Sequence, residues 1–155
     1  MIDIDIQLLK EFENQLNTND PEGGTIPVKI LGYGEMSAIF LFEEMPETAI
    51  KRMPPFHNAQ EISAYKSSID EYCGFLTDKF NMNIAEYAYV EIVNKYDEHI
   101  LYVAQNKLDV KFIGNRLIQS CKDEELEKIL KAIMNKLIPI WKWNAQNEDM
   151  IFGLD

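Results

Sequence analysis

The stretch that decides the fold covers residues 28–56 and reads VKILGYGEMSAIFLFEEMPETAIKRMPPF. Three apolar runs, at 28–31, 38–42 and 48–52, are rich in the β-branched and aromatic residues that suit strands. A Gly-x-Gly turn separates the first two runs. A polar segment containing Pro46, which cannot donate to a strand ladder, separates the second run from the third. The pattern predicts a three-stranded meander.

A lysine stands inside the third of these runs, at position 51. Burying an ammonium group is costly unless an anion meets it. Lys51 therefore predicts an anionic partner near the sheet. The alternative is a plain hairpin turn followed by a lysine at a strand edge.

The composition is that of a soluble globular domain, with 155 residues, 46% apolar and 26% charged. The formal net charge of −11 argues against binding to nucleic acid or to anionic membranes. We find no apolar run of membrane-spanning length and no basic flank of a signal peptide. Two isolated cysteines, Cys73 and Cys121, are expected to be buried thiols, so the chain is predicted to be cytoplasmic.

Residues 2–18 open with alternating Ile and Asp, and the later apolar residues are spaced as one stripe of a helix, which is predicted to pack on the sheet. A helix that binds a partner is the alternative. The stripe consists of Leu8, Leu9, Phe12 and Leu16, and the residues expected to face outward are Lys10, Glu11, Glu13 and Asn14. Residues 17–24 are rich in turn formers and predict a loop.

A long helix is predicted at 58–80, and two further strands at 86–94 and 99–104. The expected fold class is therefore α+β, with a five-stranded antiparallel sheet and a long helix between strands 3 and 4. A helical C-terminal part follows.

In that C-terminal part, a short helix is expected around Gly114. A long one, capped by Asp123, carries an apolar stripe through residues 126–141. Pro139 should kink or unwind it locally. Trp141 and Trp143 are expected to be core or inter-helix anchors.

Two segments together carry a family resemblance: Gly32-Tyr33-Gly34-Glu35-Met36-Ser37 and, after them, Ala49-Ile50-Lys51. They resemble the glycine-rich loop and strand-three lysine of protein-kinase-like enzymes. In that family the loop covers the nucleotide phosphates and the lysine holds the α- and β-phosphates. Ser37 stands where protein kinases have a third glycine, which favours small-molecule kinases of the aminoglycoside phosphotransferase type.

The resemblance implies a site for ATP with Mg²⁺, formed by the loop residues 32–37 and Lys51. It also implies a glutamate partner for the lysine, for which Glu71 is preferred over Glu61 in the first helical turns; the alternative is that Glu71 is a residue of a solvated helix face. Gln105 and Lys107 are placed by the resemblance alone at the hinge that binds adenine. A polar linker is the alternative there.

By the same resemblance, residues 1–105 would form the small lobe and residues 106–155 the hinge and part of the large lobe. Asp155 would align with the catalytic aspartate. The downstream asparagine and metal-binding aspartate of the family would then be missing, which predicts a fragment that is inactive alone. No metal site is predicted from the two histidines.

The leading hypothesis is thus a nucleotide-binding lobe of a kinase-like phosphotransferase. The second is a non-catalytic interaction module, with a possible homodimer through the helix at 123–143. The third is an unrelated α+β domain with an accidental glycine turn.

Overall fold

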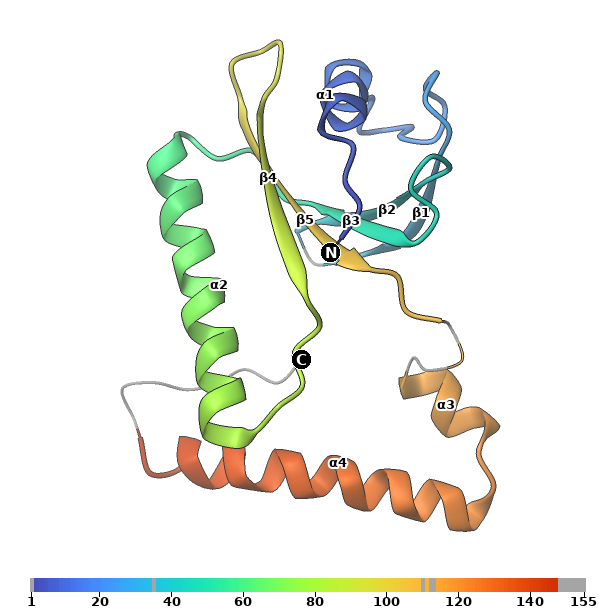
Figure 1. Ribbon diagram of the computed structural model, residues 1–155, viewed down its shortest axis with the longest axis vertical. Helices are drawn as coiled ribbons and strands as arrows, with labels where there is room; N and C mark the ends of the chain where they lie inside the picture. The colour runs from blue at the N-terminus through green and yellow to red at the C-terminus, as the bar shows by residue number, and fades with distance from the viewer. Residues whose placement is uncertain (1, 35, 110, 112–113, 148–155) are drawn as a thin grey trace. The chain divides into compact units, whose positions relative to one another are not determined.

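The computed structural model describes residues 2–34, 36–109, 111 and 114–147 (Figure 1). The chain divides into two compact units. The first combines residues 1–70 with 85–107, and the second combines 71–84 with 108–155. The sequence placed a single boundary near residue 105. The observed division also assigns the end of the long helix and the loop after it to the second unit.

The first unit contains the predicted five-stranded antiparallel sheet. Its strands run in the order β1-β2-β3-β5-β4, so the last two strands of the chain are exchanged in space. Their bounds are β1 Val28–Tyr33, β2 Ala38–Phe42, β3 Thr48–Arg52, β4 Tyr87–Val93 and β5 His99–Asn106. The bounds of β2 and β3 match the prediction, whereas β1 and β5 extend two residues further than expected. Gly32, Tyr33 and Gln105 therefore lie in strands.

Helix α1 (Ile6–Gln15) packs on one face of this sheet, as predicted. The Asp5 carboxylate caps it by accepting a 2.9 Å hydrogen bond from the Leu8 N–H. Phe12 then meets the rings of Phe40 and Phe42 edge to face, with centroids 5.2 and 5.0 Å apart. The prediction that Glu13 faces outward was wrong, because only 4% of this residue is exposed.

The opposite face of the sheet meets the first half of α2 (Ala59–Phe80), where Ile62 is buried with Met53 and Leu101. Asn58 caps this helix, since its side chain accepts from the Glu61 N–H at 2.9 Å. The Glu61 carboxylate in turn accepts from the His57 N–H at 3.0 Å. Glu61 therefore serves the helix terminus.

The second unit contains α3 (Gly114–Ser120) and α4 (Asp123–Asn144). Lys122 occupies the N-cap position, so the prediction that Asp123 caps α4 was wrong. The helix continues through Pro139 to Asn144. Trp143 packs on Phe75, with ring centroids 5.1 Å apart, whereas Trp141 is 49% exposed and is no core anchor.

Cys73 and Cys121 are free thiols, and both are partly exposed where burial was expected. Among the helices of the described ranges, none is long and apolar enough to cross a membrane.

Candidate functional site

The hairpin between β1 and β2 forms the predicted glycine loop. It closes where the Gly34 N–H donates a 2.8 Å hydrogen bond to the Ser37 carbonyl. A Cβ at position 34 would lie 2.6 Å from the Ser37 Oγ, so glycine suits this close approach. Tyr33 and Met36 are 71% and 70% exposed, and Glu35 lies outside the described residues.

A row of cross-strand neighbours links this hairpin to the lysine. Register pairs Gly32 with Ile39, Ile39 with Lys51, Lys51 with Val103 and Val103 with Tyr89. Directly opposite residues of antiparallel strands point to the same face of a sheet. Lys51 therefore shares a face with Gly32, two strands away. A β-bulge at Leu31, opposite no residue of β2, sets this register.

The space above Gly32 is open. A Cβ built at this glycine would have no heavy atom within 4 Å. The backbone of β1 can therefore be approached closely at one end of the row that holds Lys51.

Lys51 itself is half-buried in β3. No hydrogen bond or ion pair joins its ammonium group to another described residue of the sheet unit. The neighbouring Arg52 points to the α1 face instead, because successive strand residues alternate between faces. Arg52 is thus neutralised by an anion of the sheet unit, whereas Lys51 has no such partner among the described residues of that unit.

The neutralised cation belongs to a buried network. Arg52 binds the Glu13 carboxylate through two nitrogens, Nε at 2.8 Å and Nη2 at 2.7 Å. The Tyr102 hydroxyl also donates to this carboxylate, as does the Asn94 amide at 3.3 Å. Burial alone would raise the pKa of Glu13, but the Arg52 guanidinium and the other donors outweigh it and lower that pKa. This network was not predicted from the sequence.

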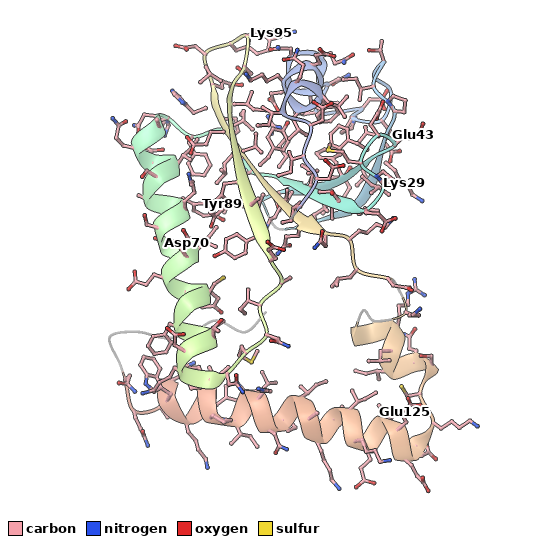
Figure 2. All side chains as sticks on the ribbon, in the orientation of Figure 1. Lys29, Glu43, Asp70, Tyr89, Lys95 and Glu125 are labelled. Atoms are coloured by element: carbon pink, nitrogen blue, oxygen red, sulfur yellow. The ribbon has the colours of Figure 1, made fainter. Side chains whose placement is uncertain are left out.

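A second missed network lies on the Lys51 face. Asp70 of α2 accepts hydrogen bonds from the hydroxyls of Tyr87 and Tyr89, at 2.8 and 2.9 Å, and Figure 2 shows it turned toward Tyr89. Burial, together with the Asp70 carboxylate, raises the pKa of Tyr89. Lys66 adds an ion pair with Glu91 at 2.7 Å and lies over the Tyr89 ring. The two tyrosines on one face of a strand were the available signal in the sequence.

The two remaining predicted catalytic residues are Glu71 and Asp155. Glu71 is an exposed residue of α2 that belongs to the second unit, so its pairing with Lys51 stays a prediction. Asp155 lies outside the described residues. Of the residues that the structure does describe, no three His, Cys, Asp or Glu side chains gather as metal ligands.

The predicted hinge is partly occupied by the protein's own bonds. Gln105 lies within β5 and pairs with both Ala49 and Tyr87. The Lys107 N–H donates to the Glu47 carbonyl at 2.8 Å, and its ammonium donates to the Pro46 carbonyl at 2.5 Å. These bonds hold the end of β5 against the turn between β2 and β3.

The chain was also compared with known proteins. No protein-family model, no curated protein and no solved structure matches it.

Proposed function

We propose that this chain is the nucleotide-binding lobe of a kinase-like phosphotransferase of the small-molecule type. In this proposal, ATP with Mg²⁺ lies against the hairpin at residues 32–37, and Lys51 binds its phosphates. Backbone amides and a lysine are the groups with which such lobes hold phosphates.

The observation that carries the proposal is the state of Lys51. Lys51 is a half-buried residue, its ammonium group has no anionic partner among the described residues of its own unit, and it shares a face with the open backbone at Gly32. A half-buried cation is stabilised by an anion that reaches it. A phosphate group above Gly32 would supply that anion.

The proposal also involves Glu71 and the backbone at the end of β5. Glu71 is proposed to orient Lys51 when nucleotide is bound, on the resemblance alone. Adenine binding at the end of β5 would have to open the bond between the Lys107 N–H and Glu47, or use another group, because that N–H is already hydrogen-bonded.

Calorimetric titration of ATP with Mg²⁺ tests the proposal. We expect the native chain to bind and Lys51→Ala to bind about 10- to 100-fold more weakly, the loss of one charge-assisted phosphate contact. Lys10→Ala is the matched control. It removes an exposed lysine of α1, the helix that packs on the opposite face of the sheet, and it should leave the affinity unchanged.

Absence of binding by the native chain would contradict the proposal, as would equal affinity of Lys51→Ala and the native chain. The second candidate, a non-catalytic interaction module, would then be preferred. An exposed apolar face on α4 favours this alternative and does not depend on nucleotide.

A further inference from the structure

Helix α4 has a broad apolar surface, and the part of it around Ile140 packs on described residues of its own unit. Ile140 is fully buried in a cluster with Leu76, and Trp143 packs on Phe75 in the same cluster. The Lys136 ammonium donates to the Asn81 carbonyl at 2.6 Å. These contacts fix which side of α4 faces residues 75–84.

Another part of this surface is exposed over about three turns. Its members recur at three- and four-residue steps, and each is more than one third exposed: Leu130 44%, Ile133 39%, Met134 40%, Ile138 36% and Trp141 49%. Half-buried Leu126 and Leu137 lie in line with them. We call these seven residues the α4 stripe. At 100° per residue, the α4 stripe borders the Ile140 face: Ile133 is only about 20° from Ile140 around the helix, whereas Leu130 and Met134 are about 80° and 120° away.

We propose that the α4 stripe is the interface of an antiparallel homodimer. With a two-fold axis between Ile133 and Met134, Ile133 of each copy would contact Met134 of the other copy. The same axis brings Leu130 opposite Leu137, and Leu126 opposite Trp141. Each of these three layers is apolar, and both copies use the same surface, as a two-fold interface requires.

The charges at the two ends of α4 favour a second copy of the chain as the partner of the α4 stripe, and they favour an antiparallel arrangement of the two helices. The first turn of α4 carries Asp123, Glu124 and Glu125, whereas its last turn carries Lys142. In the antiparallel pair each acidic end lies beside the Lys142 of the other copy, but a parallel pair would bring acid against acid. In a chain with a net charge of −11, such local complementarity is needed to offset repulsion between copies.

Sedimentation velocity of the full chain tests the inference. The stripe is short, so we expect dimers at concentrations on the order of tens to hundreds of micromolar. Glu124→Lys and Lys142→Glu should each weaken the dimer by about tenfold or more, because each places like charges together. The double variant Glu124→Lys/Lys142→Glu should restore it.

The double variant is the decisive species. Each substitution places a charge that is unfavourable to the helix dipole. If the single variants lost dimer affinity only because α4 is weakened, the double variant would lose more affinity than either of them. Lys10→Glu and Glu44→Lys are matched controls that make the same charge changes at exposed positions of the sheet unit. Leu130→Gln/Met134→Gln should abolish the dimer while circular dichroism shows an intact fold.

Three results would overturn the inference. A native chain that stays monomeric throughout this range would do so, and so would a dimer that survives Leu130→Gln/Met134→Gln. A charge swap that fails to restore association would reject the antiparallel arrangement. Because no nucleotide is present, these outcomes are independent of the test at Lys51.

Discussion

At the scale of single residues, Lys51 and Arg52 are neighbours in the chain but have different partners. They are adjacent cations in β3, but strand alternation sends them to opposite faces. Arg52 binds the buried Glu13 carboxylate. Lys51 lies on the other face, in the row of cross-strand neighbours that has the open backbone of Gly32 at one end. The chemistry that we propose depends on this difference.

Gly32→Val tests the site without touching a charge. The new side chain would enter the open space above β1, where nothing lies within 4 Å. Glycine within a strand costs roughly 0.5–1 kcal/mol relative to alanine, so the stability of the variant should be unchanged or slightly higher. Nucleotide affinity should fall by about tenfold or more, because the side chain occupies the space proposed for phosphate.

Gly24→Val is the control for this variant, because Gly24 also has open space around it but lies in the exposed loop before β1. Calorimetry and thermal unfolding of both variants give the comparison. Unchanged nucleotide binding by Gly32→Val would place the nucleotide elsewhere.

At the scale of elements, α1 is held on the sheet by packing and by one buried ion pair. Leu9 and Phe12 bury its apolar stripe. Glu13, in the same helix, accepts from donors of three other segments, namely Arg52 of β3, Tyr102 of β5 and Asn94. A buried pair of this kind matters most when one partner is removed, because the other charge is left unpaired.

Glu13→Gln should therefore destabilise the fold by about 3 kcal/mol, since it leaves the Arg52 guanidinium without its counter-charge. Urea unfolding monitored by circular dichroism measures this loss. Glu11→Gln, at an exposed position of the same helix, is the matched control and should change stability by less than about 0.5 kcal/mol. Equal effects of the two substitutions would show that the pair does not anchor α1.

Helix α2 shows a second property of the elements, because it contributes to both units. Residues up to Asp70 belong to the sheet unit, and residues from Glu71 belong to the unit that contains α4. One residue along a helix turns the side chain by about 100°. Both Asp70 and Glu71 are exposed, but the Asp70 carboxylate accepts hydrogen bonds from the two tyrosines of β4.

At the scale of the whole molecule, the Glu13 pKa predicts how global stability depends on pH. Folding lowers this pKa below its ordinary value of 4.5. The stabilisation is therefore fully present above the unfolded-state pKa and is lost as the pH falls through the lower folded-state value. The difference in unfolding free energy between the native chain and Glu13→Gln should be large at about pH 7 and much smaller at about pH 3.

Urea titrations of both proteins at the two pH values check this expectation. A difference that stays constant would mean that the carboxylate charge is not what stabilises α1. Because the chain carries 26 acidic residues, the comparison with Glu13→Gln is needed to separate this group from the others.

Much of the fold could be predicted from local patterns in the chain. The strands at 38–42 and 48–52 matched the structure at both ends, because turn formers and prolines bound each apolar run on both sides. The stripes of α1 and α4 were also readable, since a helical period of 3.6 residues is a local property. The loop closure at Gly34 and Ser37 agrees with the glycine turn that was expected.

The errors and omissions arose where the partner of a residue is distant in the chain. Glu13 was expected to face water, because a carboxylate on a helix usually does. Its burial depends on Arg52, 39 residues later, which only the packed sheet brings to it. Asp70 was missed for the same reason, because its two tyrosines follow it by 17 and 19 residues.

The sequence by itself thus determined the α+β class, the order of the elements and the two residue sets on which the proposals are built: the hairpin with Lys51, and the α4 stripe. The tertiary structure alone decided the exchanged positions of β4 and β5, the open space above Gly32, and which face of α4 is covered. The physical reason is that propensity and periodicity act over a few neighbouring residues. Burial and ion pairing depend on segments that meet only when the chain has folded.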